Sequence, residues 1–162
     1  PQPLSLFTLV HHTQVMIKEL KKHLIEFEGI VLKPYKCTAG KITIGIGRNL
    51  DDMGITEDEA MILLDNDIKN VVEEVLATWP WVDDLPPRAS MVVIDLGFNM
   101  GVPTLSTFRN MLECLKSEDW DGAAKNLLDS KYAQQVGRRA IYNAHLLETA
   151  GTEPELPSKI TF

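Results

Sequence analysis

The stretch from residue 28 to residue 47, EGIVLKPYKCTAGKITIGIG, constrains the fold of this chain more than any other. Before it, apolar residues recur at helical spacing from Thr13 onwards, and Gly29 is a natural stop because glycine accepts the left-handed conformation after a last turn. After it, turn signals and alternating residues indicate strands over about 35–37 and 42–47. We therefore predict an irregular lead-in over residues 1–12, a helix over 14–28 and then a hairpin.

The second predicted strand has two different faces. Isoleucines alternate over residues 42–46, which predicts one buried face, while Thr43, Gly45 and Gly47 occupy the other face. The two glycines leave no side chain beyond Thr43, which indicates either a bend or a surface where a ligand lies directly on the backbone. The nearby carboxylic acid of Glu28 favours the ligand surface.

Helical patterns occupy most of the chain after the hairpin. A turn is expected over residues 49–54, and then Thr56 and Glu59 have the spacing of a capping box, which predicts the start of a long helix over residues 57–78. The tail after Gly151 has no period. The remaining helical patterns lie at about 88–100, 104–117, 119–131 and 137–149.

These elements predict an α+β fold in a single domain of residues 1–162. We expect a small hairpin lobe at about 29–55, a connecting helix at about 57–78 and a helical lobe at about 79–150, together with the N-terminal helix 14–28. A groove between two such lobes is a natural place for a ligand.

Composition and charge exclude several classes of function. The chain carries 23 acidic and 16 basic residues, a net charge of −7, which argues against a nucleic-acid partner. No apolar run approaches the ~20 residues that span a bilayer, so we expect no stable membrane insertion. No Cys/His spacing, phosphate loop or nucleotide fingerprint predicts a metal or cofactor. We predict a monomer in which Cys37 and Cys114 are free thiols.

Glu28 is the candidate catalytic residue. At the end of a helix it would lie at the negative end of the helix dipole, which disfavours the ionised carboxylate. That environment suits a general acid, which must hold its proton until a leaving oxygen takes it. A solvated glutamate beside a helix cap is the alternative.

The stretch from Glu28 to Gly47 resembles the catalytic signature of the phage-type lysozymes, or endolysins, of glycoside hydrolase family 24. In that family a Glu-Gly at the end of the first helix is followed by Tyr-Lys-x-x-x-Gly-x-x-Thr-x-Gly-x-Gly, which is present here from Tyr35 to Gly47. The resemblance covers about residues 15–150. It continues through Arg88-Ala89, Phe98-Asn99-Met100-Gly101, Trp120-Asp121, Asn126 and Arg138-Arg139-Ala140.

This resemblance implies a lysozyme-like fold and an inverting muramidase that needs no cofactor. The enzyme would hydrolyse the β-1,4 bond between N-acetylmuramic acid and N-acetylglucosamine in bacterial peptidoglycan and so lyse the cell. As a phage or prophage endolysin it would be made in the host cytoplasm and act in the periplasm or cell wall. Glu28 would be the general acid, Thr43 would hold the water, and Arg139 would tune the acid. Substrate-binding residues would be Gly45, Gly47, Phe98, Asn99 and Asn126.

Cys37 departs from the family pattern, because aspartate is the commoner residue at that position. A thiol is mostly neutral at pH 7, so its role stays open: base, nucleophile, water-holder with Thr43, or a small hairpin residue. Two other functions also stay open. A lytic transglycosylase can work with one acid, and an inactive lysozyme scaffold would serve as a cell-wall binding module.

Overall fold

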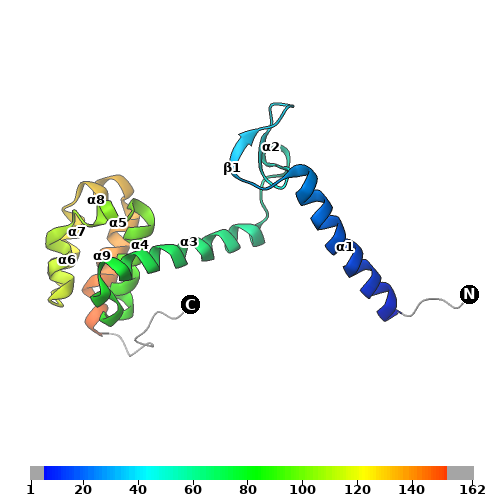
Figure 1. The fold of residues 1–162 in the computed structure, drawn as a ribbon. Coiled ribbons are helices and arrows are strands. Elements are labelled where there is room, and N and C mark those ends of the chain that lie inside the picture. Colours follow the sequence, from blue (N-terminus) through cyan, green and yellow to red (C-terminus); the bar gives the residue numbers. More distant parts are fainter. Residues whose placement is uncertain (1–5, 153–162) are drawn as a thin grey trace, which may run out of the picture. The chain divides into compact units, whose positions relative to one another are not determined.

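The computed structural model describes the backbone of residues 6–152 and the side chains of residues 13–152. The chain forms two compact units, the first ending at Ala60 and the second beginning at Met61. The fold is α+β and mainly helical, with one three-stranded antiparallel sheet in the described part of the chain (Figure 1). This confirms the predicted fold class. None of the helices described here is long and apolar enough to cross a membrane.

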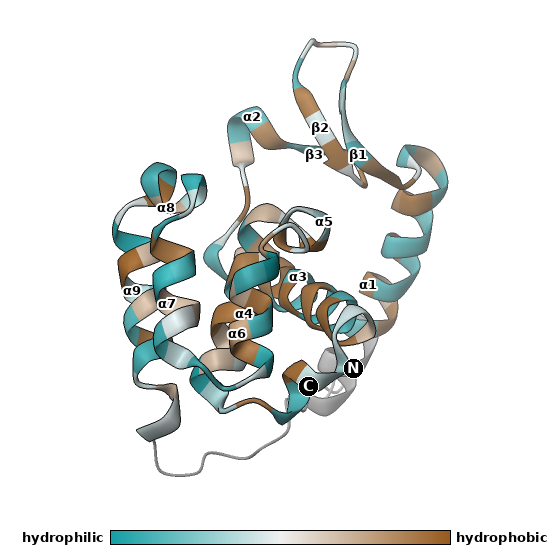
Figure 2. Ribbon diagram, turned by 90° about the vertical axis from the view of Figure 1, so that its left-hand side faces the viewer, coloured by the Kyte–Doolittle hydropathy of each residue, from teal (hydrophilic) through white to brown (hydrophobic). Residues whose placement is uncertain are grey.

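Helix α1 (Leu6–Glu28) opens the first unit. It ends as predicted, since Gly29 has φ 72° and its N–H donates to the carbonyl of Ile25 at 2.9 Å. It begins earlier than predicted, because no glycine or proline interrupts the chain between Leu6 and Thr13. The prediction of an irregular lead-in is therefore wrong for residues 6–12. Hydrophobic and hydrophilic residues share this helix (Figure 2), as its amphipathic pattern predicts.

The sheet follows α1 and has the strand order β1–β2–β3. Strand β1 (Val31–Lys36) pairs with β2 (Ile42–Gly45), with Tyr35 opposite Thr43. β2 in turn pairs with the short β3 (Arg48–Asn49). The turn between β1 and β2 is closed by Cys37, whose N–H donates to Lys41 and whose carbonyl accepts from Gly40. The hairpin therefore places Cys37 just past the end of a strand.

The predicted burial of the isoleucine face is wrong. Ile42 and Ile46 are each more than 40% exposed, whereas Thr43 on the other face is only 4% exposed. The strand ends at Gly45, and Ile46 belongs to the turn between β2 and β3. Because Gly45 and Gly47 both have φ 69°, the backbone leaves the extended conformation there and the alternation stops.

A capping box begins the long helix α3 (Glu57–Thr78) at the predicted residue. The Thr56 N–H donates to Glu59 at 2.8 Å, and the Glu59 N–H donates to the Thr56 hydroxyl at 3.2 Å. The predicted turn over residues 49–54 contains one short helix, α2 (Leu50–Met53), which is capped by Asn49.

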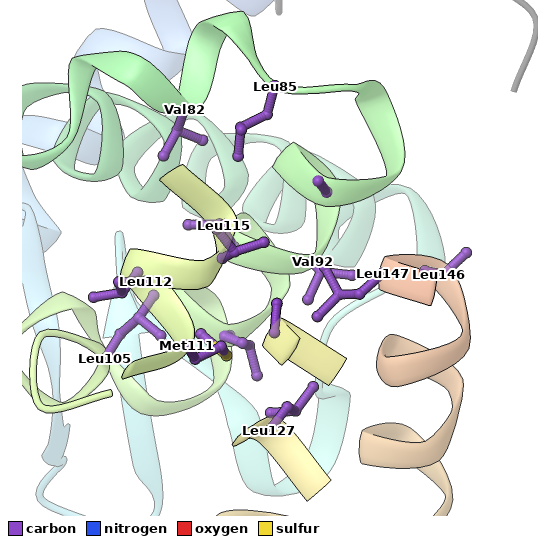
Figure 3. Packing of buried hydrophobic residues seen from close by; sticks show 14 of the residues in the cluster. Val82, Leu85, Val92, Leu105, Met111, Leu112, Leu115, Leu127, Leu146 and Leu147 are labelled. Carbon is purple, nitrogen blue, oxygen red and sulfur yellow. The ribbon is translucent and has the colours of Figure 1, made fainter. Parts of the chain in front are cut away.

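The second unit consists of most of α3 and a set of shorter helices around an apolar core. Its helix α4 (Pro87–Met100) is close to the prediction, as is α9 (Arg138–Glu148). Leucine, valine and methionine side chains from several helices meet in the core (Figure 3). The other elements are η1 (Pro80–Asp84), α5 (Val102–Leu105), α6 (Arg109–Lys116), α7 (Trp120–Leu128), α8 (Lys131–Val136) and η2 (Ala150–Thr152).

Two predicted helices are each broken in two. The pattern at 104–117 contains α5 and α6, separated by a tight turn in which Phe108 N–H donates to Leu105. The pattern at 119–131 contains α7 and the start of α8, and the Ser130 hydroxyl caps α8 by accepting from Ala133 N–H at 3.1 Å. Hydroxyl side chains compete for backbone groups and so favour such breaks. The tail after residue 152 lies outside the described residues.

Candidate functional site

The carboxyl group of Glu28 lies against the backbone of Gly47. A Cβ atom added at Gly47 would be 2.9 Å from Oε2 of Glu28 and 3.2 Å from its Cδ. Glycine is therefore needed at residue 47 for two reasons, its positive φ and the space that the carboxyl group occupies. Glu28 itself is exposed. The last residue of α1 and the turn after β2 thus come together in the first unit.

Gly45 differs from Gly47 in its surroundings. It has the same φ of 69°, but a Cβ atom added at Gly45 would have no neighbour within 4 Å. The bend that the glycine pattern predicts is present at both residues. The open space over Gly45 is also compatible with the predicted ligand surface, which stays a prediction.

Cys37 has the surroundings of an activated thiol. Hydrogen bonds hold the pKa of the Cys37 thiol below its usual value. In order of importance, they come from the backbone N–H of Ala39, the backbone N–H of Lys41 and the hydroxyl of Thr43. These groups stabilise the thiolate, the form that can act as a base. The Thr43 hydroxyl also lies 3.2 Å from the Lys41 carbonyl, so its single proton is donated either to Cys37 or to that carbonyl. Both Cys37 and Cys114 are free thiols, which confirms that prediction.

The other predicted site residues belong to the second unit. Phe98 and Asn99 lie near the end of α4 and are exposed, so Phe98 is not part of the core of its unit. Asn126 lies on α7, half-buried, and its amide nitrogen donates to the Gly122 carbonyl at 2.8 Å.

Asn126 lines an open pocket of about 640 Å³ in the second unit. This volume is within the range of small-ligand sites. The wall combines methionine, aromatic, amide and hydroxyl side chains with two cations. Its residues are Met100, Thr104, Thr107, Phe108, Arg109, Asn110, Met111, Asn126, Ser130, Lys131, Tyr132 and Gln135.

Arg139 pairs with Asp95 across helices α9 and α4. Its Nη2 is 2.5 Å from one Asp95 oxygen and its Nε is 3.1 Å from the other, and Asn143 donates to Asp95 at 2.6 Å. Burial raises the pKa of Asp95. The hydrogen bonds from Arg139 and Asn143, together with the arginine charge, outweigh burial and hold this pKa below its usual value. The same pair raises the pKa of Arg139. Two N–H groups of the Arg139 guanidinium therefore donate to Asp95, and the remaining N–H groups do not.

Sequence reasoning did not find Asp95, nor the pocket residues Arg109, Lys131 and Tyr132. One signal was present for Asp95, since it is an acidic residue inside the apolar run VVIDL. Most of the pocket residues come from two stretches, 107–111 and 130–132, and no sequence pattern shows that these two stretches meet. Within the described residues, no three His, Cys, Asp or Glu side chains gather as metal ligands would.

Comparisons with known proteins find a matching family and several relatives. The phage lysozyme family matches residues 25–143, more than half of the chain. A probable T4-type lysozyme 1 of Dictyostelium discoideum is 27% identical, over 83% of this chain and 96% of its own. An endolysin of Acyrthosiphon pisum secondary endosymbiont phage 1 is 32% identical, over 70% of this chain and 77% of its own.

A third relative is a much longer protein. The pre-baseplate central spike protein Gp5 of Enterobacteria phage T4 is 27% identical over 82% of this chain, but the match covers only 29% of the spike protein. The matched family segment contains Glu28, Cys37, Thr43 and both hairpin glycines, as well as Arg139. This chain belongs to the phage lysozyme family.

Proposed function

We propose that this protein is a muramidase that hydrolyses the β-1,4 bond between N-acetylmuramic acid and N-acetylglucosamine in peptidoglycan and so lyses bacteria. Membership of the phage lysozyme family and the endolysin among its relatives support this function. The structural observation that carries it is the exposed Glu28 carboxyl group seated against Gly47, next to the open backbone at Gly45.

Glu28 acts as the general acid. It donates its proton to the glycosidic oxygen while the bond between that oxygen and the anomeric carbon breaks. General acid catalysis of this kind is typically worth ~10²–10⁴-fold in rate. The place of the carboxyl group beside Gly47 supports this role, because the glycine leaves room for it at the open backbone surface of the hairpin.

Cys37 and Thr43 provide the water. The Thr43 hydroxyl holds a water molecule, and the Cys37 thiolate takes one of its protons as the oxygen attacks the anomeric carbon from the opposite face. The product is inverted and carries a reducing end. The lowered pKa of Cys37 supports this assignment over an inert hairpin residue, since a larger fraction of the thiol is ionised near neutral pH.

The remaining predicted residues bind the substrate. Gly45 and Gly47 form the backbone surface under the sugar, and Phe98, Asn99 and Asn126 contact the sugar or its stem peptide. Arg139 tunes the acid, the role that the family resemblance implies for it. We propose a monomer with one lysozyme-like domain, made in the host cytoplasm and acting on peptidoglycan in the periplasm or cell wall.

The products of digestion test this proposal. Purified sacculi are digested with the protein and the muropeptides are analysed by mass spectrometry, with borohydride reduction to mark reducing ends. We expect reducing N-acetylmuramic acid ends. Anhydro-muramic ends would instead show a lytic transglycosylase, and binding of sacculi without any cleavage would show a cell-wall binding module.

A further inference from the structure

The pocket beside Asn126 is positively charged in a negatively charged protein. Its wall contains Arg109 and Lys131 but no aspartate or glutamate, whereas the chain as a whole has a net charge of −7. The two cations come from different elements, since Arg109 opens α6 and Lys131 opens α8. A local excess of positive charge of this kind attracts anionic groups.

Within the part of the chain that the structure describes, neither cation has an acidic partner. Neither Arg109 nor Lys131 forms an ion pair with any of the side chains described in the structure. Other cations on the surface do form ion pairs, namely Lys22–Glu19, Lys41–Asp52, Arg48–Glu59 and Lys69–Glu73. Both side chains are exposed at the pocket. They are therefore accessible to a ligand that carries carboxylates.

The pocket also contains a buried hydroxyl group without a partner. The Tyr132 hydroxyl is the one buried side-chain polar atom, among those the structure describes, that makes no hydrogen bond. Burial raises the pKa of Tyr132, so the phenol keeps its proton and can donate. An unpaired buried donor is unfavourable, and such a group in a pocket wall indicates that a ligand or water completes it.

We propose that Arg109 and Lys131 make this enzyme selective for stem peptides with free carboxylates over stem peptides whose carboxylates are amidated. The inference rests on the proposed function and names the part of the substrate that the pocket recognises. Guanidinium and ammonium groups form charge-assisted hydrogen bonds with a carboxylate, and guanidinium can do so with both oxygens. Amidation removes the negative charge of the carboxylate and replaces one oxygen, which accepts hydrogen bonds, with an NH2 group, which donates them. That donor would face the donors of Arg109 and Lys131, so the pocket rejects the amidated stem peptide.

Digestion of two matched substrates tests the selectivity. Sacculi with free carboxylates and sacculi with amidated stem peptides are digested by the wild type and by the double variant Arg109→Gln/Lys131→Gln. We expect the wild type to prefer the free form by at least about tenfold in kcat/KM, through KM, and the double variant to lose most of this preference. A double variant Lys116→Gln/Lys125→Gln, with the same charge change on exposed lysines outside the pocket, should keep it.

A binding measurement separates this inference from the catalytic proposal. A synthetic stem peptide with free carboxylates and its amidated counterpart are titrated into the full-length wild type and both double variants. We expect the wild type and the Lys116→Gln/Lys125→Gln variant to bind the free peptide more tightly. Equal binding of both peptides by the wild type would overturn the inference even if sacculi are hydrolysed. Selective binding without hydrolysis would instead contradict the catalytic proposal alone.

Discussion

The contact between Glu28 and Gly47 is the most specific feature of the site at the level of single residues. Even a methyl group at residue 47 would lie within 2.9 Å of Oε2 of Glu28. The carboxyl group is the flexible end of its side chain, so it would move while the backbone stays. A displaced catalytic group of this kind costs on the order of 10²-fold in rate.

Substitution of the two hairpin glycines separates this displacement from backbone strain. Gly45→Ala and Gly47→Ala both force alanine into φ 69° and should each cost about 1–2 kcal/mol of stability. Gly47→Ala should lose most of the lytic activity through kcat, because its methyl group displaces the Glu28 carboxyl group. Gly45→Ala displaces no protein atom, since an added Cβ atom there has no neighbour within 4 Å, so it should act on KM by reaching into the proposed sugar surface. Thermal unfolding and the rate of sacculus hydrolysis over a range of substrate concentrations measure these effects. An equal loss of kcat in both variants would show that the contact with Glu28 does not matter.

Cys37 controls the acidic side of the pH–rate profile if it is the base. Hydrogen bonds from Ala39, Lys41 and Thr43 lower its pKa, so activity should rise with pH at a midpoint below the ordinary thiol value of about 8.5. Cys37→Asp should stay active with an optimum at lower pH, because its carboxylate is ionised well below neutrality. Cys37→Ser should lose most activity, since a hydroxyl group does not ionise in this range.

The serine variant gives the clearest result for Cys37. If Cys37→Ser keeps the wild-type rate and an unshifted pH profile, the thiol only fills space or holds water. Glu28 and Thr43 would then carry the chemistry.

The elements with local signals are the ones that sequence reasoning predicts well. The end of α1 and the start of α3 agree with prediction because each depends on residues within one turn, Gly29 in one case and the Thr56–Glu59 box in the other. The break between α5 and α6 was missed because the apolar spacing continues through it. The isoleucine face was misjudged because alternation does not tell which face of a strand is buried, and within β2 Thr43 is buried while Ile42 is exposed.

The ion pair between α4 and α9 shows what sequence reasoning does not reach. Asp95 and Arg139 are 44 residues apart, and only the packing of the two helices brings them together. Their charges are partly exposed, so the pair is screened by solvent. It still connects the stability of the second unit to pH.

The lowered pKa of Asp95 determines the direction of that dependence. A carboxyl group with a depressed folded-state pKa contributes stability above its unfolded pKa of about 3.9 and loses it as pH falls through the folded value. Asp95→Asn should therefore be less stable than the wild type at pH 6, with the difference shrinking towards pH 2. Urea unfolding followed by tryptophan fluorescence reports this, because Trp79, Trp81 and Trp120 all belong to the second unit.

A control separates the ion pair from the loss of one charge. Asp67→Asn removes an exposed carboxylate from α3 and should keep the wild-type stability at both pH values. An Asp95→Asn variant that unfolds like Asp67→Asn would show that the pair contributes nothing to the stability of α4 and α9.

At the scale of the whole molecule, the candidate residues divide between two compact units. Glu28, Cys37, Thr43 and the hairpin glycines belong to the first unit, and the pocket and Arg139 belong to the second. The family and fold class were predictable because a motif of consecutive residues carries them. The pocket was not, because its wall comes from several separate helices and turns. The single domain and the substrate-binding roles stay predictions.

The central claim is that the Glu28 carboxyl group protonates the leaving oxygen, and one variant tests it directly. Glu28→Gln keeps the shape of the side chain, but its amide has no acidic proton to transfer to the leaving oxygen. Glu26→Gln, which makes the same change on an exposed residue of the same helix, is the matched control. The release of reducing ends from sacculi is measured for both variants and the wild type, with circular dichroism to check the fold. We expect Glu28→Gln to lose ~10²-fold or more and Glu26→Gln to match the wild type. A folded Glu28→Gln variant that keeps more than about a tenth of wild-type turnover would contradict the claim.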